Sequence, residues 1–224
     1  MTTKTWQQLE ADAKAHLAKG EIGKAAHLLI DAIDLAPNEA GLYRQLVQVA
    51  LMAGGTDTAV KAATELRRLE PSNPEAGYLL AVASMAHGDF VLAESTLDAV
   101  AKQAPRSWQI KQAQAQVARA LKKDGQARQA LEDALSLAPT EPSVVNDYAV
   151  LLLELDESAR AKELLVKALA AHPAEAGLHL NLALAYGKLK DLTKAKHHAE
   201  RAQTAGDADV REQAARVLAQ LFPQ

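Results

Sequence analysis

The sequence predicts an all-α protein built from repeated pairs of helices, and two observations carry this prediction. First, 49% of the 224 residues are apolar but only 4% are aromatic, and alanine and leucine dominate. Both are strong helix formers, whereas the β-branched and aromatic residues that favour strands are sparse. Second, prolines recur every 34 residues, at Pro37, Pro71, Pro105, Pro139 and Pro173. A fixed period of this length is typical of a helical repeat array.

The period divides most of the chain into six blocks, which begin at Trp6, Ala40, Pro74, Trp108, Pro142 and Ala176. The twentieth residue of every block is alanine: Ala25, Ala59, Ala93, Ala127, Ala161 and Ala195. The eighth residue is small in nearly all of them: Ala13, Val47, Ala81, Ala115, Ala149 and Ala183. Small residues at fixed places let two helices approach closely, and larger neighbours fill the gaps. Each block therefore predicts two closely packed helices.

The fifteenth position of each block marks the turn between its two helices. In the first three blocks it holds Gly20, Gly54 and Gly88. A glycine just past a helix end takes the left-handed conformation that closes the helix. The last three blocks have Lys122, Asp156 and Lys190 there. In the fourth block, whose Gly125 comes three residues later, we expect either a longer first helix or a turn built differently.

This pattern resembles the tetratricopeptide repeat. The resemblance rests on the 34-residue period with a small residue at position eight, glycine at fifteen, alanine at twenty and proline at thirty-two, and it covers residues 6–209. It implies a right-handed superhelical α-solenoid of antiparallel helix pairs, in which the first helix of each pair lines the concave face. We expect six repeats in residues 1–209 and a capping helix with a short tail in residues 210–224.

The last segment departs from the repeat. Its apolar residues form one stripe on an amphipathic helix over 210–221, made of Val210, Ala214, Val217, Leu218 and Leu221. The end of a solenoid exposes apolar surface, so a helix with one polar side is expected to cover it. The alternative is that this helix mediates dimerisation.

Composition excludes several classes of protein. A net charge of −3 and a pI of about 6.2 argue against nucleic-acid binding, which needs a basic surface. The absence of cysteine removes disulfides, thiolate metal sites and cysteine nucleophiles. No apolar stretch approaches the length of a membrane span, and the first residues contain no apolar leader. We expect a cytoplasmic protein, although a periplasmic or lipid-anchored form whose leader had been removed would look the same.

We find no arrangement of residues that predicts catalysis, and no cofactor or metal site. The adjacent His197 and His198 point about 100° apart on a helix and cannot share a tetrahedral metal site, so we interpret them as part of a solvated face. The basic segment 187–201 either attracts an acidic partner or is an ordinary charged face balanced by Asp191 and Glu200. The sequence therefore predicts that the protein is not an enzyme.

The resemblance implies that a partner lies along the concave face, at fixed positions of each first helix. The candidate groove residues are Arg44, Gln48, Tyr78, Val82, Met85, Gln112, Gln116, Arg119, Asn146, Val150, Leu153, Leu180, Asn181 and Leu184. They form two apolar patches, around Tyr78 and Leu180, separated by a polar centre. A helical or extended segment with two apolar anchors fits such a lining. The alternative is that some of these side chains pack against the next repeat.

The leading hypothesis is a non-catalytic scaffold that binds a protein or peptide partner. The size and composition are similar to those of repeat proteins that assist bacterial secretion and pilus assembly. Some family members grip a chaperone's C-terminus with a carboxylate clamp, but its elements never occur in order here, and only Lys14, Gln45, Asn146 and Asn181 match parts of it. The alternative function is self-association through the ends or the convex face, with Trp6 and Phe222 as interface anchors.

Overall fold

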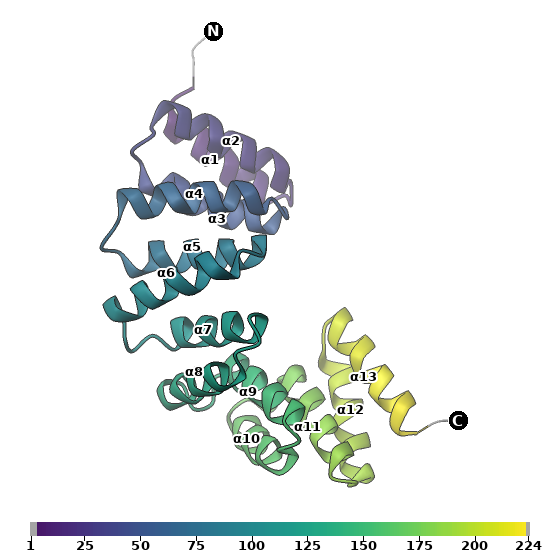
Figure 1. Ribbon diagram of the computed structural model, residues 1–224. Helices are drawn as coiled ribbons and strands as arrows, with labels where there is room; N and C mark the ends of the chain where they lie inside the picture. The colour runs from purple at the N-terminus through teal and green to yellow at the C-terminus, as the bar shows by residue number, and fades with distance from the viewer. Residues whose placement is uncertain (1–3, 223–224) are drawn as a thin grey trace. The chain divides into compact units, whose positions relative to one another are not determined.

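A computed structural model describes residues 4–222 as thirteen α-helices, with no strand in that range. The helices are α1 (Trp6–Leu17), α2 (Ile22–Leu35), α3 (Ala40–Met52), α4 (Thr56–Leu69), α5 (Pro74–His87), α6 (Phe90–Gln103), α7 (Trp108–Ala120), α8 (Asp124–Leu137), α9 (Pro142–Glu154), α10 (Ser158–Ala171), α11 (Ala176–Lys188), α12 (Leu192–Ala205) and α13 (Ala208–Leu221) (Figure 1). The predicted fold class, an all-α solenoid of helix pairs, is confirmed.

The chain divides into two compact units. Unit 1 is Met1–Pro105 with Gln116–Lys122, and unit 2 is Arg106–Ala115 with Lys123–Gln224. Within unit 1, α1 packs with α2, α3 with α4, and α5 with α6, and each pair packs on the next. Within unit 2, α9 pairs with α10 and α11 with α12, and α13 packs on the last pair. Each unit is therefore a short stack of helix pairs.

The core repeats with the period of the sequence. The first helix of each pair, from α1 to α11, begins at the first residue of a 34-residue block. The six alanines at position twenty are completely buried, and the small residues at position eight are at most 1% exposed. Large side chains such as Leu29, Leu97, Leu131 and Leu165 fill the space beside these alanines. Small residues thus bring the helices together, as the pattern predicts.

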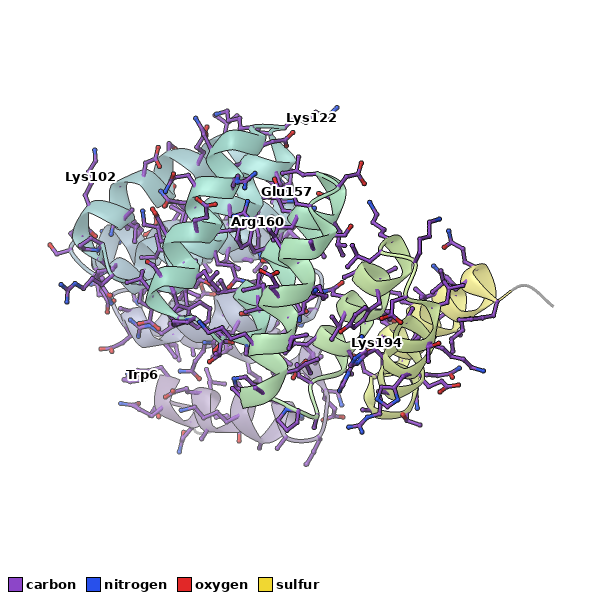
Figure 2. The ribbon with its side chains drawn as sticks, turned by 90° about the horizontal axis from the view of Figure 1, so that it is seen from below. Trp6, Lys102, Lys122, Glu157, Arg160 and Lys194 are labelled. Atoms are coloured by element: carbon purple, nitrogen blue, oxygen red, sulfur yellow. The ribbon has the colours of Figure 1, made fainter. Side chains whose placement is uncertain are left out.

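The turn inside each pair keeps one backbone geometry although its sequence changes. At position fifteen φ is 75°, 73° and 89° for Gly20, Gly54 and Gly88, and 58°, 60° and 65° for Lys122, Asp156 and Lys190. All six residues are therefore left-handed. A longer first helix in the fourth block was an alternative, and it is wrong: α7 ends at Ala120 and Gly125 lies inside α8. The exposed Lys122 side chain points away from the helices (Figure 2).

Helix α13 covers the end of the α11–α12 pair. Ala214 and Val217 are buried, and Val210, Leu218 and Leu221 pack around them. Their partners on α11 and α12 are Leu180, Ala183, Ala199 and Ala202. The Asp207 carboxylate caps the helix by accepting a hydrogen bond of 2.9 Å from the Val210 amide. Ala214 and Val217 thus lie in the core of the last helix pair, and the other three residues of the apolar stripe pack against that core.

Candidate functional site

The candidate groove residues lie on the first helices of the pairs, and in unit 1 three of them form an apolar stripe on α5. Tyr78, Val82 and Met85 are spaced i, i+4 and i+7, so they share one face of the helix. All three are partly exposed. Within residues 4–222 the Tyr78 hydroxyl has no hydrogen-bond partner, and burial raises the pKa of this phenol. We call Tyr78, Val82 and Met85 the α5 patch.

Arg44 on α3, the helix that packs beside α5, is engaged by acidic side chains. Its Nη2 lies 2.7 Å from Glu70 Oε2 and its Nε lies 3.2 Å from Glu75 Oε2. The Asn73 amide also donates to Glu70, over 2.6 Å. The charge of Arg44 is therefore neutralised within the fold, which makes it a poor receptor for a partner's carboxylate. Gln48, one helical turn further along α3, is exposed.

Several polar groove residues pair with the neighbouring repeat, which the sequence reasoning missed. Gln112 Nε2 donates to Asp147 Oδ2 over 2.8 Å, and Asn181 Nδ2 donates to Asn146 Oδ1 over 2.9 Å. In unit 1, Gln45 Nε2 donates in the same way to Glu10 Oε1 over 2.7 Å. Each pair joins position five of one repeat to position six of the next, 35 residues later. The regular occurrence of polar residues at these two positions is the signal that could have predicted the pairing.

The second predicted apolar patch, around Leu180, is smaller than expected, because three of the candidate groove residues on α9 and α11 are buried. Leu153, Leu180 and Asn181 are only 7%, 6% and 8% exposed. Leu180 belongs to the core under α13, where Val217 packs. The sequence hypothesis that these three line an open groove is therefore corrected: they hold the repeats together.

The remaining candidates stay at the surface to different degrees. Val150 is partly exposed and Leu184 is 37% exposed on unit 2. On α7, Gln116 is exposed and Arg119 is partly buried. The exposed groove lining of unit 2 is thus two separate aliphatic side chains, whereas unit 1 offers the continuous α5 patch.

A hydrogen-bonded pair of histidines, the buried His179 and the partly buried His198, joins α11 to α12. His179 Nε2 lies 3.0 Å from the Pro173 carbonyl oxygen, which can only accept, so this nitrogen carries the proton. His179 Nδ1 is then the acceptor for His198 Nδ1–H, 2.9 Å away. Tyr186 stacks on His198 with ring centroids 5.6 Å apart. Burial lowers the pKa of His179. Burial also lowers the pKa of His198, to about 4, so both rings are neutral at pH 7.

This pair corrects the interpretation of the adjacent histidines as a solvated face, which holds only for His197. His198 is turned inward, because α11 presents His179 and Tyr186 to it. The basic segment around it is largely balanced by ion pairs. Lys194 lies 3.0 Å from Asp191, Lys188 2.7 Å from Asp156, and Lys196 4.0 Å from Glu200.

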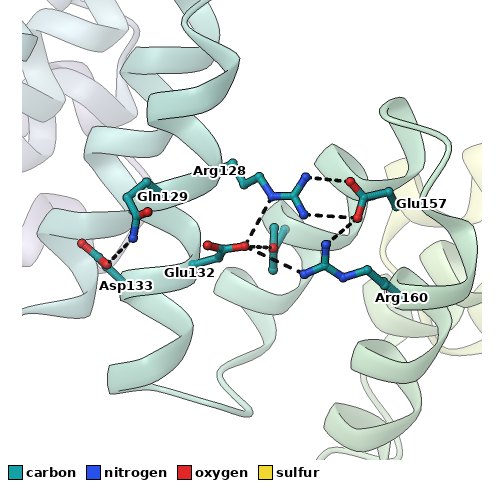
Figure 3. Close-up of polar contacts among 7 residues, drawn as sticks. Arg128, Gln129, Glu132, Asp133, Glu157 and Arg160 are labelled. Carbon is teal, nitrogen blue, oxygen red and sulfur yellow. Dashed lines mark hydrogen bonds and ion pairs between the residues drawn. The ribbon is translucent and has the colours of Figure 1, made fainter.

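A network of ion pairs connects α8, α9 and α10 within unit 2 (Figure 3). Arg128 makes a forked contact with Glu157, with nitrogen–oxygen distances of 2.6 and 3.2 Å. Arg160 forms an ion pair with Glu157 as well, and the two residues lie side by side in Figure 2. Glu132 accepts a 2.6 Å hydrogen bond from the Tyr148 hydroxyl. Hydrogen bonds from the Arg128 and Arg160 guanidinium groups lower the pKa of Glu157. The network satisfies its own charges, so we assign it to structure and not to ligand binding.

The described part of the chain offers little for chemistry. Across residues 4–222 no three His, Asp or Glu side chains come together in a way that could hold a metal ion. No helix in that range is both long and apolar enough to cross a bilayer.

Two comparisons with protein families identify the repeats. Profiles described as tetratricopeptide repeat match residues 50–117 and residues 176–205. The matches fall on α3–α7 and on the α11–α12 pair, which have the helix–turn–helix geometry described above. The chain is made of tetratricopeptide repeats. Such repeats are protein-interaction modules, so the chain belongs to a class of interaction scaffolds.

Solved tetratricopeptide-repeat structures share this fold at low sequence identity. PilW, described as a widely conserved type IV pilus biogenesis factor, is 13% identical with a TM-score of 0.77, over 97% of this chain and 100% of its own. The pilF protein of Pseudomonas aeruginosa is 17% identical with a TM-score of 0.71, over 94% and 97%.

A third similar structure is the Cut9–Hcn1 hetero-tetramer of the APC/C. The match is 17% identical with a TM-score of 0.74 and covers 96% of this chain, which spans only 43% of that one. At these identities the likeness concerns the fold of the repeats. No curated protein matches the chain significantly.

Proposed function

We propose that this tetratricopeptide-repeat protein is a non-catalytic scaffold that binds a segment of a partner protein on the first helices of its repeats. The observation that carries the proposal is the α5 patch, where an aromatic ring, a valine and a methionine share one accessible helix face. Apolar side chains grouped at a surface mark contact sites. Methionine adapts to the shape of its partner, and tyrosine supplies contact area at low entropic cost.

The chemistry of the α5 patch indicates what its ligand presents. The patch accepts an apolar side chain, and the free Tyr78 hydroxyl can donate to a backbone carbonyl or a side-chain acceptor. Gln48, exposed on the neighbouring helix α3, can bond a peptide group. Arg44, by contrast, is neutralised by Glu70 and Glu75. We therefore propose an apolar segment, helical or extended, and not an acidic tail.

We also propose, more broadly, a role as an accessory in assembling a multiprotein complex of the secretion or pilus type. Its support is the fold likeness to PilW and pilF over nearly the whole of both chains. The cytoplasmic location and the absence of nucleic-acid binding stay predictions from composition.

The proposal is tested by capturing partners from cell lysate with the native protein and three variants. Tyr78→Glu and Val82→Glu each place a charge in the α5 patch. Val91→Glu is the matched control, because Val91 is an apolar residue of the same repeat that is 70% exposed on the second helix α6. Leu180 is unsuitable as a second test position, because a charge there would disrupt the core.

We expect partners that are captured by the native protein and by Val91→Glu to be lost with Tyr78→Glu and with Val82→Glu. Circular dichroism of all four proteins should be the same, because none of the changed residues is in the core. An identical set of partners from every version would contradict the proposed site.

A further inference from the structure

Helix α13 has the position of the first helix of a repeat, and no second helix is formed beside it by residues 4–222. In the described part of unit 2, α9 pairs with the antiparallel α10 and α11 with α12. Helix α13 packs on α11 and α12 in the same way that α11 packs on α9 and α10. No antiparallel helix of the described residues then packs on α13. The face that would receive one is therefore open.

The sequence of α13 equips this face for helix packing. Counted from the first residue of each helix, Ala215 and Leu218 of α13 correspond to Ala183 and Tyr186 of α11. In α11 these residues face α12: Ala183 is completely buried and Tyr186 stacks on His198. Both α13 residues are only partly buried, and Ala219, which follows Leu218, is exposed. Small residues next to larger ones at this face are what close helix contact requires.

A groove runs along the open face. Lys196, Glu200, Leu218, Ala219 and Phe222 line a space of about 410 Å³ between α12 and α13. Lys196 lies over the Phe222 ring, with its Nζ 5.7 Å from the ring centroid. Leu192, which is 43% exposed, lines an adjoining space that shares Lys196, Glu200 and Phe222 with this groove. The groove is thus an apolar strip with a charge of each sign on one wall.

We propose that this groove binds the α13 helix of a second copy of the chain, forming a two-fold symmetric dimer. A two-fold axis perpendicular to α13 makes the two copies of this helix antiparallel, which is the orientation that a helix pair requires. Each α13 then takes, on the other copy, the place that the second helix has in the other repeats. The helix carries Asp209, Arg211, Glu212 and Arg216, two charges of each sign, so two copies approach without net repulsion.

The dimer is tested by measuring molar mass with light scattering and sedimentation, over concentrations from micromolar to millimolar. The native protein should approach twice the mass of the chain as concentration rises. Ala219→Glu places a carboxylate in the contact and should hold the protein at the mass of one chain. Gln220→Glu is the matched control, since Gln220 is the exposed next residue and points to another side of α13, and it should dimerise like the native protein.

A second measurement uses the absence of cysteine from the chain. Ala219→Cys should form disulfide-linked dimers under mild oxidation, either with itself or with Ala215→Cys, whereas Gln220→Cys should not. A single-chain mass for the native protein across the whole range would overturn the proposal. A dimer that Ala219→Glu leaves intact would place the contact elsewhere and overturn it too. An unchanged circular dichroism spectrum of Ala219→Glu shows that loss of the dimer is not loss of the fold.

Discussion

The third and sixth repeats have the same backbone but fill the space between their helices differently. Position four of the first helix is Gly77 in α5 and His179 in α11. A Cβ added to Gly77 would lie 2.3 Å from Val100 Cγ2. Helices α5 and α6 can therefore pack this closely only because Gly77 has no side chain. In the sixth repeat an imidazole occupies this space and is held by Pro173 and His198. One geometry is thus stabilised by close packing in one repeat and by a hydrogen-bonded, partly buried polar pair in the other.

The two units can be followed separately, because each contains one of the two tryptophans. Trp6 lies in unit 1 and Trp108 in unit 2. With Trp108→Phe, fluorescence reports the unfolding of unit 1, and with Trp6→Phe it reports unit 2. The predictions below use these two backgrounds, so that a change in one repeat is measured in its own unit.

The largest effect is expected from Gly77→Ala, which should lower the free energy of unfolding of unit 1 by about 1–3 kcal/mol, the usual cost of overpacking a core. The added methyl group cannot be accommodated unless Val100, which is completely buried, moves. Urea unfolding followed by Trp6 fluorescence measures the change.

The control for this substitution is Gly41→Ala in α3. Apart from its chain neighbours and the nearby backbone of its own helix, no atom lies within 4 Å of the position that its Cβ would take, and the residue is helical. The same chemical change should there raise the stability by about 0.5–1 kcal/mol, because alanine is the better helix former. Equal effects at the two positions would show that close packing does not distinguish Gly77.

The histidine pair should make unit 2 lose stability as pH falls from about 6.5 towards 4. A histidine of the unfolded chain takes up a proton near its ordinary pKa of about 6.5. His198 in the fold does so only near its pKa of about 4. Between these values the unfolded state binds more protons, so stability decreases with falling pH, by about 3 kcal/mol in total. No carboxylate offsets the charge, because Lys194, His197 and Arg201, the groups that act on His198 besides His179, are basic.

Urea unfolding of unit 2 at a series of pH values measures this effect. The carboxylates with lowered pKa in unit 2, such as Asp156 and Glu157, lose their contribution only as pH falls through their own lower range. The slope between pH 6.5 and 4.5 therefore belongs to the histidines. This slope should disappear in the double variant His179→Gln, His198→Gln and persist in the control His172→Gln. A slope that survives loss of the pair would assign it to other groups.

The sequence predicted the elements of the fold well, because each repeat is specified locally. The alanines at position twenty and the prolines between blocks act within one helix pair, so their period alone places the helices. The site was predicted less well, because exposure depends on what the next element covers. Leu180 has the position of a groove residue but is buried by α13. Asn146 and Asn181 also have groove positions, but their side chains form a hydrogen bond with each other. The His179–His198 pair joins residues 19 apart, and neither periodicity nor charge pattern reveals such a contact.

The smallest effect is expected at position fifteen, where the turn is made by glycine in the first three repeats and by lysine or aspartate in the last three. Lys190 is left-handed with φ of 65°, a conformation that costs a residue with a side chain about 1 kcal/mol and glycine almost nothing. Lys190→Gly should therefore stabilise unit 2 by about that amount, whereas Lys167→Gly inside α10 should destabilise it, although the chemical change is the same.

The gain from Asp156→Gly should be smaller than from Lys190→Gly, because aspartate tolerates this conformation better and Asp156 also binds Lys188 at 2.7 Å. Urea unfolding followed by Trp108 compares the three. If Lys190→Gly does not stabilise the unit, the lysine turn carries no strain, and the glycines of the first three repeats are not needed for their turns.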